Sequence, residues 1–242
     1  VLSLIFIDSI LKGGRSTTFS AYDIRIQPIC FIIGCVAIFA SILLLKFSQN
    51  IKASYLKPRL IDIIHTLKLR HNLYIFLMIF GIFFTFQAML NFIPFELARI
   101  DENYNSSKAG MLYIGYLIGV LVAFNTKKIT ALFRSPITAI IAGIITLIIA
   151  IQIFRIESFG LIFVAMAVFC LGNFIAHSIA SGFVNKMATT HKGISNGLYV
   201  SFYYFGGALG SFLPGLIYMP FGWNAFLWFL SVISFISLIF IL

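Results

Sequence analysis

Charged side chains are scarce in this sequence. Only 10% of its 242 residues are Asp, Glu, Lys or Arg, whereas 61% are hydrophobic. A soluble domain carries roughly 25% charged residues, so most of this chain requires a solvent other than water. Its mean hydropathy is +1.05, and apolar runs of about 18 or more residues identify segments that cross a bilayer.

Cysteine is also rare, and the motifs of common enzymes are missing. The three cysteines, Cys30, Cys35 and Cys170, lie inside apolar runs, and an odd number without metal-ligand spacing argues against disulfides and zinc. The sequence lacks Gly-x-Ser-x-Gly, a phosphate-binding loop, His-Glu-x-x-His and carboxylate pairs within the apolar runs. We therefore predict no enzymatic activity, no cofactor and no metal site, and keep an intramembrane enzyme only as a third hypothesis.

Seven apolar segments are long enough to cross a membrane as helices. They lie near residues 28–47, 73–95, 107–124, 136–153, 159–184, 195–219 and 223–242. Their length favours helices over strands, because a helix satisfies every backbone polar group within its own span. The apolar stretch 1–11 is too short to span and does not resemble a signal peptide. We expect it to be the tail of a truncated helix, with an N-terminal portion missing.

The basic residues, which give a net charge of +10, lie in the connectors between apolar segments. Alternate connectors, 49–72, 125–135 and 185–194, hold ten Lys and Arg residues, whereas the opposite set holds two, Arg99 and Arg155. Cytoplasmic loops carry the excess of positive charge, so we predict that the first set and the C-terminus are cytoplasmic. Lys12, Arg15 and Arg25 would then lie outside, which the loss of upstream helices could explain. This placement argues against nucleic acid as a partner.

The longest of these connectors carries a short amphipathic pattern. Leu60, Ile63, Ile64 and Leu67 share one helical face, and Arg59, Asp62, His65 and Lys68 share the other. A basic amphipathic helix of this kind lies along the membrane surface and pairs with anionic lipid; the alternative is an ordinary solvated linker. We therefore divide the chain into residues 1–47, a cytoplasmic linker at 48–72 and a six-helix bundle at 73–242.

One helix, a basic linker and six closely spaced helices resemble the C-terminal half of the major facilitator superfamily. More specifically, two stretches are similar to helices ten and eleven of its bacterial inner-membrane drug:proton antiporter branch. They are Asn173-Phe-Ile-Ala-His-Ser-Ile-Ala-Ser-Gly-Phe-Val184 and Asn196-Gly-Leu-Tyr-Val-Ser-Phe-Tyr-Tyr-Phe-Gly-Gly207. Gly222-Trp223, which comes just before the last helix, also fits this branch. The connector 125–135 departs from the family, because it lacks the glycines and the aspartate of the Gly-x-x-x-Asp motif.

The resemblance implies an all-α membrane protein, with the end of an N-terminal half at 1–47. It further implies a secondary active transporter in the bacterial inner membrane, working by alternating access with the missing N-terminal half. The expected activity is proton-coupled efflux of a small organic solute or drug. The alternative is a non-transporting remnant of a truncated gene or an oligomerising membrane scaffold, and the upstream coding sequence distinguishes these.

Polar residues inside the spans are the candidates for transport, because such groups are costly in hydrocarbon. Asn173, His177 and Ser181 recur every four residues and so share one helical face. Imidazole has an unperturbed pKa near 6.5, so His177 is our candidate for proton coupling, with interhelical packing as its alternative. Candidate substrate contacts are these three residues together with Gln87, Asn91, Tyr116, Tyr199 and Tyr203.

Two further features accompany these candidates. Small residues at four-residue spacing let helices approach closely, so Gly206, Gly207, Gly210 and Gly215 are predicted packing positions. Glu96, near Pro94 at the end of its span, is interpreted as an interfacial charge, with gating as the alternative.

Overall fold

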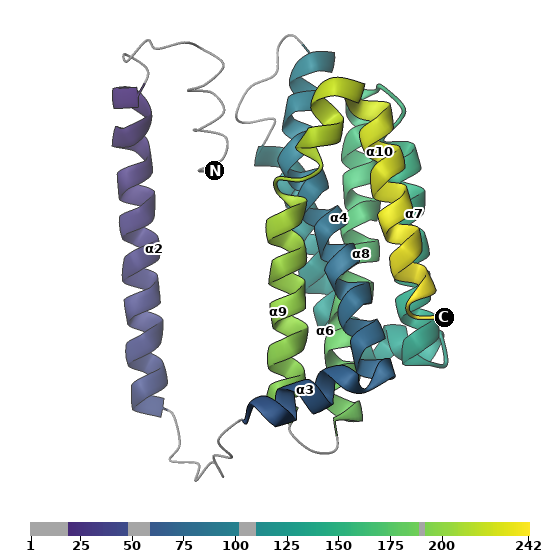
Figure 1. The fold of residues 1–242 in the computed structure, drawn as a ribbon. Helices are drawn as coiled ribbons and strands as arrows, with labels where there is room; N and C mark the ends of the chain where they lie inside the picture. Colours follow the sequence, from purple (N-terminus) through teal and green to yellow (C-terminus); the bar gives the residue numbers. More distant parts are fainter. Residues whose placement is uncertain (1–18, 48–58, 102–109, 189–191) are drawn as a thin grey trace. The chain divides into compact units, whose positions relative to one another are not determined.

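The computed structural model describes residues 19–47, 59–101, 110–188 and 192–242, and side chains from residue 31 onward. These residues form helices and no strand, as expected for an all-α membrane protein (Figure 1). The chain divides into two compact units, Val1–Leu56 and Lys57–Leu242. The truncated helix predicted at 1–11 and the linker segment 48–58 lie outside the described residues.

The first unit contains one described helix, α2 (Phe19–Phe47). It begins nine residues before the predicted start at Pro28, so this proline lies inside the helix and removes one backbone hydrogen bond there. Its residues Phe31–Phe47 form an apolar helical segment.

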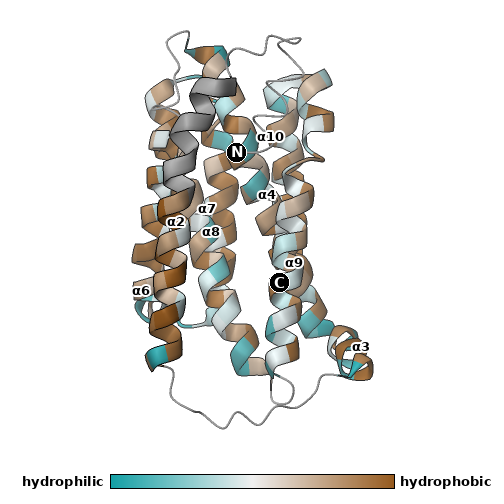
Figure 2. Ribbon diagram, turned by 90° about the vertical axis from the view of Figure 1, so that its left-hand side faces the viewer, coloured by the Kyte–Doolittle hydropathy of each residue, from teal (hydrophilic) through white to brown (hydrophobic). Residues whose placement is uncertain are grey.

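The second unit is a helical bundle. Its elements are α3 (Leu60–Lys68), α4 (Arg70–Ile100), η1 (Tyr113–Gly115), α6 (Tyr116–Leu132), α7 (Pro136–Ile153), α8 (Phe159–Met187), α9 (Lys192–Gly210) and α10 (Gly215–Ile239). Five described helical segments are long and apolar enough to cross a membrane: α4, Gly110–Leu132, α7, α8 and α10. α9 does not reach that hydropathy because polar and glycine residues interrupt it, and it is paler than α4, α7 and α10 in Figure 2.

The main departures from the predicted bounds occur at turns. The span predicted at 195–219 is divided, since α9 ends at Gly210 and α10 begins at Gly215. Pro214 has no N–H to donate to the Gly210 carbonyl, although Leu213 N–H still reaches Leu209 O at 2.8 Å. The connector predicted at 220–222 is a kink within α10, where Gly222 adopts a φ of 75°. The connector predicted at 125–135 is mostly helical, because α6 continues to Leu132.

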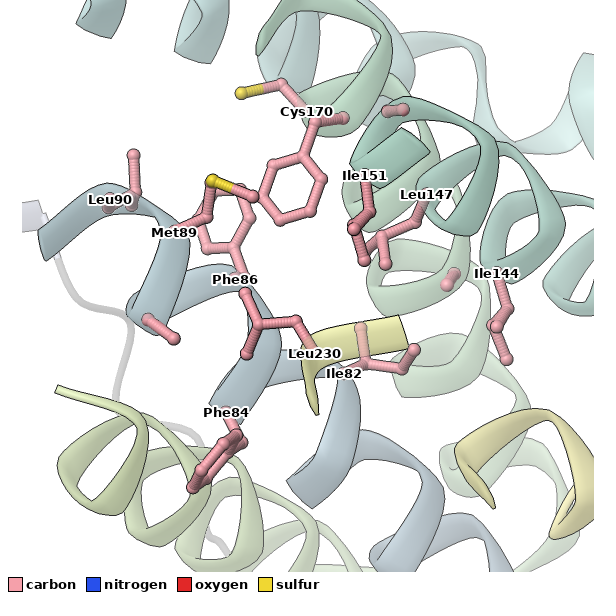
Figure 3. Packing of buried hydrophobic residues seen from close by; sticks show 14 of the residues in the cluster. Ile82, Phe84, Phe86, Met89, Leu90, Ile144, Leu147, Ile151, Cys170 and Leu230 are labelled. Atoms are coloured by element: carbon pink, nitrogen blue, oxygen red, sulfur yellow. The ribbon is translucent and has the colours of Figure 1, made fainter. Parts of the chain in front are cut away.

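α4 is the most buried helix among the candidate spans. Its most apolar 18-residue window is 67% buried, against 17% for Gly110–Leu132. It contacts α8, α9 and α10, and its side chains Ile82, Phe86 and Met89 belong to the same apolar core as residues of α7, α8 and α10 (Figure 3). Side chains on α4 therefore reach α8 and α9, the two helices that carry most of the candidate site.

Glycines set the two closest helix pairs. A Cβ on Gly143 of α7 or Gly172 of α8 would lie 2.6–2.8 Å from backbone atoms of the other helix. A Cβ on Gly206 or Gly210 of α9 would overlap the carbonyl oxygens of Phe80 and Phe84 on α4. Without side chains at these positions the backbones of α7 and α8, and those of α4 and α9, pack directly together.

Candidate functional site

A histidine of α8 and two tyrosines of α9 join these two helices. His177 Nδ1 lies 3.0 Å from the hydroxyl oxygen of Tyr199, and that hydroxyl donates to the His177 carbonyl oxygen at 3.1 Å. The Tyr203 ring lies 4.7 Å from the imidazole, centroid to centroid. Tyr199 is only 1% exposed, whereas His177 and Tyr203 are half-buried. The structure thus brings three of the predicted residues into contact.

Aromatic rings extend this cluster across α4 to α6. Tyr203 stacks on Phe83 with ring centroids 3.5 Å apart, and Phe83 stacks on Phe86 at 5.7 Å. Phe86 in turn meets Tyr116 edge to face at 5.7 Å. Tyr116, the fourth predicted residue, therefore belongs to the same aromatic row, and it is 37% exposed.

Gln87 and Asn91 lie on α4 beside α9. The Asn91 amide donates to the Gln87 carbonyl oxygen at 2.8 Å and to the Ser211 hydroxyl at 3.2 Å. Gln87 Cβ lies 3.9 Å from the position that a Cβ on Gly207 would occupy. Both predicted residues are half-buried, and Asn91 also links α4 to the turn after α9.

The remaining polar residues of the predicted α8 face differ in their surroundings. Asn173 is 1% exposed, and its Oδ1 is buried without a hydrogen-bond partner among the described residues. Ser181 is half-buried, and its carbonyl oxygen accepts from the Asn185 amide at 3.1 Å. An unpaired buried acceptor costs about 1–3 kcal/mol, so Asn173 is the more unusual residue.

The predicted glycines line the α4 side of α9 and the start of α10. Gly206 and Gly210 face the α4 backbone, as described above. A Cβ on Gly207 would lie 2.8 Å from the Phe83 ring, and one on Gly215 would lie 3.1 Å from the Phe92 ring. The backbone contact at Gly206 brings Phe83 within stacking distance of Tyr203, so helix packing helps to position the aromatic row.

Glu96, interpreted from the sequence as an interfacial charge near the end of its span, is buried among neighbouring side chains. It is 1% exposed, and Arg99, one helical turn later, pairs with it at an N–O distance of 2.7 Å. Arg99 also pairs with Glu157 at 2.6 Å, and the Tyr218 hydroxyl lies 3.5 Å from Glu96 Oε2. These four side chains line an open pocket of 580 Å³ together with Met219, Phe221, Gly222, Trp223 and Asn224. The Glu-x-x-Arg spacing was the sequence signal for this pair.

Other polar links were also missed from the sequence. Gln152 of α7 donates to the Ser231 hydroxyl at 2.8 Å, and the Ser234 hydroxyl donates to Thr85 of α4 at 3.2 Å. These bonds attach α10 to α7 and α4. Among the described residues no group of three or more His, Cys, Asp or Glu side chains could hold a metal ion.

No protein-family model matches the chain. It is 28% identical over 224 residues, 87% of its length, to an uncharacterized transporter of Buchnera aphidicola subsp. Schizaphis graminum. It is 26% identical over 235 residues, 95% of its length, to the inner membrane transport protein YnfM of Escherichia coli K12. It is also 26% identical over 137 residues, 56% of its length, to the uncharacterized MFS-type transporter YybF of Bacillus subtilis.

These matches cover only part of each relative. They span 50%, 55% and 33% of the three relatives' own lengths. The relatives are named as transporters, and the apolar helices are long enough to cross a membrane several times. The chain is therefore a multi-pass membrane protein similar to transporters, one of which is named as MFS-type.

Proposed function

We propose that the chain is part of a major facilitator superfamily transporter that exchanges a small organic solute for protons. In this proposal residues 73–242 are the C-terminal six-helix half, 48–72 the linker, and 1–47 the end of the N-terminal half. The observation that carries the proposal is the contact of His177, inside α8, which is long and apolar enough to cross a membrane, with Tyr199 and Tyr203 of α9. Ionisable groups inside membrane spans are rare and line substrate or proton paths.

His177 is the proposed proton carrier. Because a tyrosine hydroxyl has one hydrogen, donation to the His177 carbonyl leaves the oxygen of Tyr199 to accept from Nδ1–H. The neutral ring is then protonated at Nδ1, and Nε2 is the atom that accepts the transported proton. Tyr199, which is fully buried, positions the imidazole by this pair of bonds.

The proposed substrate is an apolar or aromatic molecule with a few polar groups. Tyr203, Phe83, Phe86 and Tyr116 offer a row of rings from three helices, and aromatic faces bind apolar rings by stacking. Further polar contacts come from Gln87, Asn91, Asn173 and Ser181. Substrate and proton therefore meet on one surface, since His177 lies against Tyr203.

The proposed setting is a bacterial inner membrane, with a matching N-terminal half as partner. The described cations of the connectors predicted to be cytoplasmic lie at the end of the bundle where α4 and α9 begin and α6 and α8 end. This distribution supports a cytoplasmic location for that end and for the C-terminus. Transport would proceed by rocking of the two halves around the site between them.

The test uses the complete gene product in liposomes loaded with a pH-sensitive dye. Aromatic solutes and lipophilic dyes are screened for substrate-driven proton movement, and exchange of labelled for unlabelled substrate is measured in parallel. We expect His177→Asn to abolish proton movement while exchange continues, because exchange requires no net proton transfer. Tyr199→Phe removes a hydrogen bond worth about 1 kcal/mol and should shift the pH profile of proton movement.

Tyr204→Phe is the matched control, because Tyr204 lies on the same helix and its side chain is 65% exposed. It should leave the pH profile unchanged. Proton movement that keeps its rate and pH dependence in His177→Asn would remove this residue from coupling. A complete gene product that moves no solute under any gradient would favour the non-transporting alternative.

A further inference from the structure

The exposed face of α3 combines large apolar side chains with positive charge. Leu60, Ile61 and Ile64 are 79%, 70% and 51% exposed, although α3 has only nine residues and is too short to span a membrane. At 100° per residue they share an arc of about 140° with His65 and Lys68, both of which are exposed. A face of this composition requires a partner that is both apolar and negatively charged.

The opposite face of α3 is held against the bundle. Thr66 is buried, Ile63 and Leu67 are half-buried, and α3 contacts α4 and α9. The Asn72 amide donates to the Thr66 carbonyl oxygen at 3.4 Å across the bend at Leu69. The apolar stripe predicted from the sequence is therefore divided: its inner half packs on the bundle and its outer half stays exposed.

The surroundings of α3 are basic. In Figure 1 α3 lies across the end of the bundle, beside the start of α9 and the end of α8. Exposed cations on α3, at its two ends and on the adjoining ends of α8 and α9 are Arg59, Lys68, Arg70, Lys186 and Lys192. The Asp62 carboxylate accepts from the Arg59 backbone N–H at 3.2 Å, so this acid stabilises the first turn of its own helix.

We propose that α3 and these cations bind anionic phospholipid at the membrane surface. Leu60, Ile61 and Ile64 enter the boundary between headgroups and acyl chains, while the cations pair with headgroup phosphates. The bilayer is the partner because α4 continues from α3 into the membrane after one residue. Since α3 packs on α4 and α9, this lipid contact bears directly on the two helices that hold Phe83, Tyr199 and Tyr203.

The test measures the depth of a nitroxide at position 64 in the full-length protein. Ile64→Cys is labelled after replacement of the native cysteines, in nanodiscs of phosphatidylcholine alone or of an equal mixture with phosphatidylglycerol. In the anionic discs we expect the label to be reached by oxygen and protected from a water-soluble nickel complex. In phosphatidylcholine alone we expect protection from the nickel complex to decrease.

Charge variants provide the second arm. Each cation near an anionic surface contributes about fivefold to binding, so Arg59→Gln, Lys68→Gln and Arg70→Gln together should weaken it about 100-fold and abolish the protection. The matched control, Lys127→Gln with Lys128→Gln and Arg134→Gln, removes the same charge from α6 and the turn after it, and should retain protection. Equal loss in both variants, or equal nickel access in both lipids, overturns the proposal. Protection from both reagents in every lipid would indicate a protein partner and overturn it as well.

Discussion

The packing of α9 on α4 is tested most directly by Gly206→Ala. The added Cβ would overlap the Phe80 carbonyl oxygen, and a backbone atom of a central helix has little freedom to move away. Overpacking of this kind costs about 1–3 kcal/mol, and alanine returns about 1 kcal/mol through its better helix propensity. Taking the upper part of that range, we expect a net destabilisation of about 1–2 kcal/mol.

Gly197→Ala is the matched control, since it is the same substitution on the same helix and its Cβ would meet nothing within 4 Å. The higher helix propensity of alanine relative to glycine should then stabilise the protein by about 0.5–1 kcal/mol. The two variants should differ by about 2 kcal/mol, or about 6 °C in melting temperature for a domain of this size.

Thermal unfolding in nanodiscs, followed by tryptophan fluorescence, measures this difference, because both tryptophans, Trp223 and Trp228, lie in α10, which packs on α4. Equal melting temperatures for Gly206→Ala and Gly197→Ala would refute the direct backbone contact between α4 and α9.

Two further substitutions test buried polar groups by the same melting assay. Arg99→Gln leaves the Glu96 carboxylate without its ion-pair partner and should destabilise the protein by about 1–2 kcal/mol. This is less than the loss of a fully buried pair, because Arg99 is 53% exposed. Adding Glu96→Gln to the same chain should recover most of that loss, and a failure to recover would show that the charge of Glu96 is not the cause. Asn173→Leu removes the unpaired Oδ1 and should raise the free energy of unfolding by about 1 kcal/mol while lowering solute exchange. A lower free energy of unfolding would contradict the absence of a hydrogen-bond partner for Oδ1.

The helices could be predicted well where the signal is local. The helix at Pro136–Ile153 has the predicted bounds, since Ser135 and Pro136 are typical of a helix start and the whole segment is apolar. A connector was predicted at 220–222, where Pro220 and Gly222 are local turn signals, and the structure has a kink within α10 at this place. The division of the span at 195–219 was missed: one proline in an apolar run interrupts a helix without changing its hydropathy.

The candidate site was harder to predict because it depends on rotations between helices. Spacing placed Asn173, His177 and Ser181 on one face of α8, but only packing decides which of them meets α9. Glu96 pairs with Arg99, which also pairs with Glu157, 58 residues beyond Arg99, and sequence spacing alone does not predict this second pair. Gly143 and Gly172 show the same four-residue spacing of small residues that predicted the packing positions of α9, since Ala139 and Ala176 lie four residues from them. This spacing predicts a close helix contact but does not predict which helix makes it.

The helix contacts differ in kind, and under the proposed function this difference separates the contacts that stabilise the bundle from those that take part in transport. Backbone contacts at glycines join α4 to α9 and α7 to α8, and such contacts allow little movement. α8 and α9 meet through the side chains of His177, Tyr199 and Tyr203, whose rotamers can change without moving a backbone. In the proposed mechanism, protonation of His177 alters this contact while both helix pairs remain intact. Accordingly, Gly206→Ala should change melting more than the pH profile of transport, whereas Tyr199→Phe should do the reverse.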